Sequence, residues 1–526
     1  MKRLNRFLAV CFLGILTAGI HLGCTQTVSA QEEVPPPVLV EDSSSNTVSG
    51  KGGNGNDETP GEWYRGETPD NLIADAPVLL FVPGLNNVAQ IFWENNDMYE
   101  TAYQAGYQTA FIQLHDAGGE SADMWNNGSL LASKIREISN AFNGKQITVV
   151  AYSKGGVDTQ TALTYYDAGP YVENVITLSS PHHGSELADL AYSGGAGWLA
   201  ELIGMQGEGT ASMQTAYMAD FRAQTDANGN AYQHNYYTIG GTNWGTPFSA
   251  NWFGGVYLSS YGPNDGVVTV ASSNLPGGQE LRIGDWNHTS VRSGATFPVF
   301  RDYLSGHQLV TTNNSTPIGE EKNFPMPKTN HWVDGGPLTE QDEISVYVEE
   351  DVDSLGLQIL TAESLTEVEL LSPTGKKVDV SVKEVQMEEG IFKDASRYVM
   401  EVPSPVSGEW KIKTQSPAEE NAYLLVADYQ SDHLLSAENG NVLLGNNLVL
   451  LHAESSKIDQ DSLVATYHVI ETNNPKNHTQ WQATGRDALS QSLQLDEKDG
   501  TYTITIDIEG KTKAGNIFKR SVIYSQ

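Results

Sequence analysis

The sequence predicts an α/β domain, in which a mostly parallel sheet is covered by helices on both faces, followed by two all-β sandwich domains. In the first half of the chain, short apolar runs alternate with segments of helical composition, as in a parallel sheet with crossover helices. After about residue 310 the helical patterns fade, and short alternating runs separated by turn residues follow. A chain of 526 residues is long enough for two or three domains.

The apolar runs of the first half define the expected elements. The expected strands are 78–82, 109–114, 146–150, 175–178 and 236–239. The expected helices are 96–105, 129–142 and 157–166. Ligands of such sheets bind at the carboxyl ends of the strands, so we expect the chemistry in the loops that follow these strands.

Composition also divides the chain outside the α/β domain. We interpret residues 1–30 as a secretory signal peptide, because three early cations precede an apolar stretch and Val28-Ser29-Ala30 fits a cleavage site. An alternative is lipoprotein anchoring through Cys24. The expected domains are a flexible linker 31–70, the α/β domain 71–312, a second linker 313–335, and sandwiches at 336–430 and 431–526. Few contacts are expected to cross the second linker.

Charge and cysteine content exclude several classes of function. The formal net charge is −35, which argues against nucleic acid and anionic surfaces as partners. The only cysteines are Cys11 and Cys24, so a chain that begins after residue 30 has no disulfide and no thiol chemistry. After the signal peptide, no apolar run approaches membrane-spanning length.

Ser153 lies where a nucleophile is expected. It follows a buried strand and precedes a helix, within Ala151-Tyr152-Ser153-Lys154-Gly155. This is a variant of the G-x-S-x-G nucleophile elbow, in which small residues let the strand and helix backbones pass closely. Ala151 replaces the first glycine at the cost of one methyl group. The backbone N–H of Lys154 then lies at the start of the helix, where it can stabilise an oxyanion.

An acid and a base follow in the chain order that this arrangement requires. Asp265 lies in a turn before an apolar pair, expected to be a strand, and His288 lies in a later loop. His307 is the alternative base. We interpret His182, His183 and the pair His115-Asp116 as structural, and Asp158 as a solvated surface residue. Residues 190–209 are interpreted as a mobile apolar lid, with a buried helix as the alternative.

Several of these segments together resemble the secreted bacterial triacylglycerol lipases. The matching segments, within about residues 77–303, are 82–85 (VPGL), 151–156 (AYSKGG), 180–185 (SPHHGS), 212–221 (SMQTAYMADF), 264–268 (NDGVV) and 287–288 (NH). The resemblance implies an α/β-hydrolase fold with Ser153 as nucleophile, Asp265 as the orienting acid and His288 as the base. It also implies that the backbone N–H groups of Leu85 and Lys154 form the oxyanion hole.

The chain departs from this family at two positions. Lys154 stands where such lipases usually carry methionine or glutamine, which puts the surroundings of the leaving group in doubt. Ser290 stands where several of them carry a calcium-binding aspartate two residues after the histidine. We therefore expect no metal and no cofactor. The C-terminal sandwiches look like immunoglobulin-like modules, with an unknown partner, and have no counterpart in the shortest such lipases.

These observations predict a secreted serine hydrolase that cleaves carboxylic esters, with acylglycerol-type lipids as the expected substrates. One alternative is an extracellular polyester depolymerase whose sandwiches dock on insoluble polymer. Another is a catalytically inactive surface-binding protein. A fragment of about residues 60–312 is expected to fold and to hydrolyse a soluble short-chain ester at near full kcat.

Overall fold

The first sheet of the computed structural model is mostly parallel. The structure describes residues 34–40, 58–246, 249, 251–306, 330–387, 391–418, 420–431, 434–437, 448–493, 495 and 500–526. The strand order in the first sheet is β1-β2-β4-β3-β5-β6-β7-β8, with β1 and β2 antiparallel to their neighbours and the other pairs parallel. These strands are β1 (Val38–Leu39), β2 (Trp63–Arg65), β3 (Val78–Val82), β4 (Thr109–Ile112), β5 (Ile147–Tyr152), β6 (Val172–Leu178), β7 (Asn235–Gly241) and β8 (Gln279–Gly284).

Helices cover both faces of this sheet. The α-helices are α1 (Met98–Gln104), α2 (Met124–Ala141), α3 (Lys154–Tyr165), α4 (Glu186–Ala191), α5 (Gly197–Leu202), α6 (Glu208–Ala211), α7 (Thr215–Asp226), α8 (Trp252–Leu258), α9 (Val270–Ser273) and α10 (Phe297–Phe300). The 3₁₀ helices are η1 (Ala89–Phe92), η2 (His115–Gly118), η3 (Gly169–Tyr171), η4 (Ser290–Arg292), η5 (Gly294–Thr296), η6 (Arg301–Tyr303) and, in the second sandwich, η8 (Gly485–Asp487).

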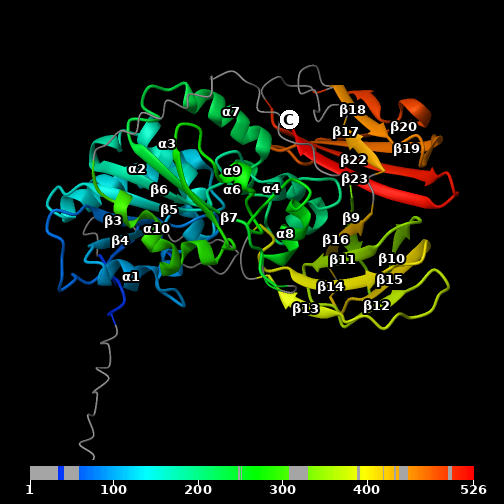
Figure 1. Ribbon diagram of the computed structural model, residues 1–526, viewed down its shortest axis with the longest axis horizontal. Coiled ribbons are helices and arrows are strands. Elements are labelled where there is room, and N and C mark those ends of the chain that lie inside the picture. The colour runs from blue at the N-terminus through cyan, green and yellow to red at the C-terminus, as the bar shows by residue number, and fades with distance from the viewer. Residues whose placement is uncertain are drawn as a thin grey trace, which may run out of the picture. The chain divides into compact units, whose positions relative to one another are not determined.

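The alternation of side chains along each strand explains this layering. Leu80 of β3 packs with Ile135 of α2 in the core on one face. The next residue, Phe81, points to the other face and stacks on Phe111, which also contacts Tyr99 of α1. In Figure 1, α2 and α3 lie on one side of the sheet, and α1 and α10 lie on the other.

Antiparallel sheets form the C-terminal half, as expected for sandwiches. The first sandwich pairs the sheets β10-β15-β12 and β13-β14-β11-β16-β9 around one apolar core, and the second pairs β17-β18-β21 and β20-β19-β22-β23 around another. Their strands are β9 (His331–Leu338), β10 (Gln341–Val348), β11 (Ser354–Thr361), β12 (Glu367–Leu371), β13 (Lys383–Gln386), β14 (Ser396–Pro403), β15 (Gly408–Gln415), β16 (Asn421–Gln430), β17 (Leu435–Ala437), β18 (Leu448–Ala453), β19 (Ile458–Glu471), β20 (His478–Thr484), β21 (Ser490–Ser492), β22 (Tyr502–Thr512) and β23 (Ile517–Ser525).

The sandwiches and the α/β part share a buried core. Residues 35–526 form one compact unit. Leu190 and Leu199 of the α/β part belong to the same buried apolar cluster as Val333, Leu424 and Ile523 of the sandwiches. The expectation that few contacts join the two halves is therefore wrong. Both halves are acidic, but apolar burial does not depend on their charges.

Hydrogen bonds reinforce this shared core. Gln214 lies between two sandwich residues, because its Nε2 donates to Thr503 Oγ1 at 2.6 Å and its Oε1 accepts from Thr472 Oγ1 at 2.6 Å. The Ser525 hydroxyl of β23 accepts from the backbone N–H of Ala216 at 2.8 Å. The side chains of Gln214 and Ser525 are therefore paired at this interface.

Four local expectations differ from the structure. The segment 31–70, expected to be a linker, includes β1 and β2, and β9 begins inside the expected linker 313–335. α2 begins at Met124 rather than at 129, because Asp123 caps it by accepting from the backbone N–H of Asn126 at 2.8 Å. The apolar pair after Asp265 forms no strand. It lies in a turn closed by an isolated bridge between residues 264 and 269.

Candidate active site

The backbone of Ser153 has an unusual conformation at the carboxyl end of β5. Its φ is 53° and its ψ is −134°, which costs a non-glycine residue conformational energy. Tight packing holds it there. A Cβ on Gly155 would lie 2.3 Å from the carbonyl oxygen of Pro83, and one on Gly156 would lie 2.1 Å from Ser180 Oγ. The small residues of the motif are therefore required by the close approach of the helix to neighbouring segments.

Ser153, His288 and Asp265 form a continuous chain of hydrogen-bond contacts. The distance from His288 Nε2 to Ser153 Oγ is 3.1 Å, and from His288 Nδ1 to Asp265 Oδ2 it is 2.7 Å. The three residues are 8%, 5% and 0% exposed, respectively. A carboxylate only accepts hydrogen bonds, so the Nδ1 proton faces Asp265 and leaves Nε2 able to accept the Ser153 proton.

The surroundings fix the orientation of the acid and of the imidazole. Asp265 Oδ1 accepts from the backbone N–H groups of Val267 and Val268 at 3.0 and 2.8 Å. On the other side, the His288 ring lies against Tyr152, with ring centroids 5.0 Å apart. Neither Asp265 nor His288 needs to rearrange before it can accept or transfer a proton.

The loop after β3 lies directly against the nucleophile. A Cβ on Gly84 would lie 2.6 Å from Ser153 Cβ, so only glycine permits this approach. Leu85 follows and lines the same cavity as Ser153 and Lys154, the first residue of α3. Asn86 has a φ of 54°, and its backbone N–H donates to Asp116 Oδ1 at 3.2 Å. The expected oxyanion residues thus line the same cavity as Ser153.

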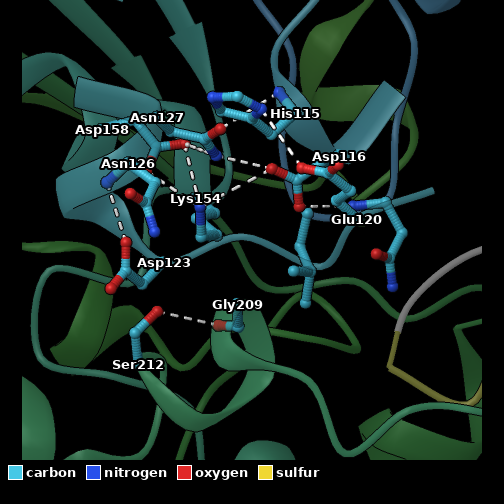
Figure 2. Close-up of polar contacts among 12 residues, drawn as sticks. His115, Asp116, Glu120, Asp123, Asn126, Asn127, Lys154, Asp158, Gly209 and Ser212 are labelled. Atoms are coloured by element: carbon cyan, nitrogen blue, oxygen red, sulfur yellow. Dashed lines mark hydrogen bonds and ion pairs between the residues drawn. The ribbon is translucent and has the colours of Figure 1, made fainter. Parts of the chain in front are cut away.

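The side chain of Lys154 points into a buried polar cluster (Figure 2). Its Nζ contacts Asp158 Oδ1 and Oδ2 at 2.9 and 3.1 Å and Asp116 Oδ2 at 3.8 Å. Burial lowers the pKa of the Lys154 ammonium, but Asp116 and Asp158 raise it, and the net direction is upward. Burial raises the pKa of Asp158 to about 7, although Lys154 acts in the opposite direction.

This cluster corrects one prediction and resolves one doubt. Asp158 is 1% exposed, so its interpretation as a solvated surface residue is wrong. Its carboxylate faces Asp116 and Asn127 of neighbouring segments as well as the cation four residues before it. The Lys154 ammonium is held in this cluster by Asp158 and Asp116, so its charge is engaged there.

The structure describes the surroundings of His182 and of the predicted lid. His182 is fully buried, and its Nε2 lies 3.3 Å from Thr177 Oγ1, as expected for a structural residue. The predicted lid contains α5, in which Leu199 is buried and Trp198 is 56% exposed. His307 lies outside the described residues. Within the described part of the chain, no group of three or more His, Cys, Asp or Glu side chains could hold a metal ion.

The cavity over Ser153 is small and is lined in part by a residue of the first sandwich. Its volume is about 30 Å³. Ile391, which precedes β14, lines it together with Ser153, His288 and Leu85. A larger open hollow of about 510 Å³ lies near Gln146, at the opposite ends of the strands from this chemistry.

Sequence reasoning missed Ile391 and the partners of Lys154. A separation of 238 residues between Ile391 and Ser153 leaves no local pattern that could connect them. The polar cluster around Lys154 left a weak pattern in the sequence. Asp116 follows a buried strand, and Asn127 and Asp158 each lie about one turn after the start of a helix.

The fold and the site together define a class of protein. A mostly parallel α/β sheet with an elbow serine, a later acid and a later histidine at its carboxyl edge is the arrangement of an α/β-hydrolase. Within that class, comparisons identify relatives. No model of a known protein family and no curated protein matched the chain.

Solved structures do match. The chain is similar to the propeptide form of the Bacillus licheniformis lipase BlEst2, with 33% identity and a TM-score of 0.76 over 89% of this chain and 97% of that one. The mature form of the same lipase is 45% identical over 47% of this chain and 100% of that one, with a TM-score of 0.45. The chain therefore belongs to the bacterial lipases and esterases of the α/β-hydrolase fold.

Proposed function

We propose that this protein is a secreted serine hydrolase that cleaves carboxylic esters, with acylglycerol-type lipids as substrates. The hydrogen-bonded chain of Ser153, His288 and Asp265 carries the proposal. It supplies the nucleophile, the base and the acid that orients the base, at the edge of the sheet where α/β proteins bind ligands.

The geometry supports the following mechanism. Ser153 Oγ attacks the ester carbonyl carbon while His288 Nε2 takes its proton. The carbonyl oxygen becomes an oxyanion, which the backbone N–H groups of Leu85 and Lys154 stabilise. His288 then gives its proton to the leaving alcohol. A water molecule, deprotonated by the same imidazole, hydrolyses the acyl-enzyme, and Asp265 stabilises the imidazolium in both steps.

The first sandwich limits access to Ser153. An acylglycerol needs more room than the small cavity over Ser153 provides, and Ile391 of the first sandwich is among the residues that line this cavity. The similar structure of the B. licheniformis lipase is described as a propeptide form. We infer that in this chain the C-terminal half slows access to Ser153 until it moves away or is removed.

The proposed location rests on residues 1–30, expected to be a signal peptide, which lie outside the described residues. In the part that the structure describes, no helix is long and apolar enough to cross a membrane.

Reaction with a fluorophosphonate probe tests the proposed function. The wild-type chain should be labelled once, at Ser153, and should hydrolyse p-nitrophenyl esters. Ser153→Ala should abolish labelling and lower kcat by on the order of a millionfold. Ser133→Ala, an exposed serine on α2, is the matched control and should behave as wild type. Ester turnover in Ser153→Ala within about tenfold of wild type would overturn the proposal.

A further inference from the structure

Three buried side chains form a cluster behind the proposed oxyanion hole, and the proposed mechanism does not use them. They are Asp116 in η2, Asn127 in α2 and Asp158 in α3, and each is at most 1% exposed. Lys154 lies at their centre and is also 1% exposed. Isolated buried charges are costly, so a cluster of this kind is retained only where its members compensate one another.

Asp116 connects the two sides of the oxyanion hole. Its Oδ1 accepts from the backbone N–H of Asn86, the residue that follows Leu85, at 3.2 Å. Its Oδ2 accepts from Asn127 Nδ2 at 2.5 Å and lies 3.8 Å from Lys154 Nζ. One carboxylate therefore contacts the loop that carries one proposed oxyanion donor and the side chain of the residue that carries the other.

The remaining contacts make this connection rigid. Asp158 binds Lys154 Nζ through both carboxylate oxygens, and Asn127 Nδ2 also donates to Asp158 Oδ2 at 3.2 Å. Asn127 Oδ1 accepts from the backbone N–H of His115 at 3.1 Å, which holds the segment that contains Asp116. The cluster thus joins η2, α2 and α3 to the loop after β3.

We propose that Asp116 is a positioning residue, which with Lys154, Asp158 and Asn127 sets the separation and direction of the two oxyanion donors. The proposal rests on the proposed function of Ser153. The Asn86 contact sets the position of the preceding peptide group, and the Lys154 contact sets the first turn of α3. Oxyanion donors act only if they already point at the position where charge develops. A displacement of about 1 Å can lower the rate by about a hundredfold.

Two variants test the two arms of the cluster in the full-length chain. Asp116→Asn keeps the shape of the side chain but removes the charge that holds Asn127 and Lys154. Lys154→Met with Asp158→Asn removes the cation and one carboxylate together, which avoids leaving two unpaired buried acids. Asp123→Asn is the matched control, because it removes a carboxylate from the cap of α2, where asparagine caps equally well.

Kinetic constants measured per active site distinguish a positioning role of the cluster from an effect on folding stability alone. We measure kcat and KM on p-nitrophenyl butyrate, with kcat expressed per fluorophosphonate-titrated site, so that unfolded molecules do not enter the value. Both test variants should lower kcat about 10- to 100-fold and leave KM within about threefold, because the oxyanion exists only in the transition state. The Ki of an alkyl trifluoromethyl ketone, whose adduct carries an oxyanion, should rise in proportion to the fall in kcat/KM. Asp123→Asn should match wild type in all three values.

Other outcomes overturn the proposal and can be told apart. If kcat per titrated site stays within about threefold of wild type in both variants, the cluster is only structural. If KM rises while kcat is unchanged, the cluster shapes substrate binding rather than the oxyanion hole. If the wild-type chain is not labelled by the fluorophosphonate at all, the proposed function of Ser153 fails before the cluster is tested.

Discussion

At the residue scale, the site depends on how each polar side chain is satisfied. Ser153 stays in a strained conformation because its neighbours are packed too tightly to let it relax. Asp265 is fully buried, and its two oxygens accept from His288 and from two backbone N–H groups. These hydrogen bonds hold the carboxylate in one orientation. It therefore accepts from Nδ1 of the imidazole and keeps the proton on that nitrogen, so that Nε2 can act as the base.

The first prediction concerns the identity of the base. His288→Ala should lower kcat on a soluble ester by at least about 10⁴-fold, because no other group then takes the Ser153 proton. His307→Ala is the control and should leave kcat unchanged. Steady-state kinetics of both variants check this, and loss of activity in His307→Ala alone would move the base to that residue.

At the element scale, the junction of β3, β5 and α3 determines the position of the nucleophile. The first turn of α3 passes so close to the end of β3 that Gly155 has no room for a side chain. The same closeness brings the loop after β3 against Ser153. Strand order, with β3 next to β5, is therefore as important to the site as the motif itself.

The second prediction tests this junction. Gly155→Ala should push α3 away from the Pro83 carbonyl, and it should lower the free energy of unfolding by more than about 1 kcal/mol as an overpacked site. The substitution should also lower kcat by a larger factor than the factor by which it changes KM. Gly229→Ala is the control, because a Cβ there meets nothing within 4 Å. Equal denaturant midpoints for the two variants would contradict the prediction.

A further element-scale prediction concerns α4, which packs against β23 of the second sandwich. Glu186 begins α4, and its Oε2 is buried without a hydrogen-bond partner. Burial raises the pKa of Glu186 to about 8. The folded state therefore binds this proton more tightly than the unfolded state, and its contribution to stability, full below about pH 4.5, is lost as the pH rises through about 8.

Glu186→Gln should remove this dependence, because the amide does not ionise. The Tm of the wild type should fall relative to that of Glu186→Gln between pH 5 and pH 9, and the difference should be small at pH 5. Thermal melts of both proteins at the two pH values check the sign. Parallel changes in the two proteins would contradict it.

At the scale of the whole molecule, the C-terminal half is part of the active-site structure. The shared apolar core and the contacts of Gln214 and Ser525 join it to the α4 to α7 region. A fragment of residues 60–312 would expose the apolar surface of this core, so its solubility should be poorer than independent domains would imply. Its active-site cavity, however, would no longer be lined by Ile391.

The last prediction follows from the position of Ile391 in the lining of this cavity. Ile391→Ala in the full-length chain should increase the rate of fluorophosphonate labelling and kcat/KM on a short-chain ester by several-fold, because it enlarges the cavity over Ser153. Val406→Ala, an exposed residue of the same sandwich, is the control and should change neither rate. Unchanged labelling in Ile391→Ala would mean that this residue does not limit access.

The sequence by itself determined the features that depend on neighbouring residues. The run 78–82 matches β3, and Ser153 lies between β5 and α3 as its motif predicts, because strand, turn and helix are local choices of the backbone. The predicted serine, acid and histidine also meet in the structure, since each follows a strand at the same edge of one sheet.

Only the tertiary structure decided where buried charges and distant segments meet. Asp158 is a charged residue of the helix after Ser153 and is expected at the surface, yet it is buried because Asp116 and Asn127, from other elements, complete its surroundings. Ile391 reaches Ser153 because two acidic halves share an apolar core, and no local pattern encodes that contact. Burial and ion pairing depend on separations in space, and packing of the whole chain determines these separations.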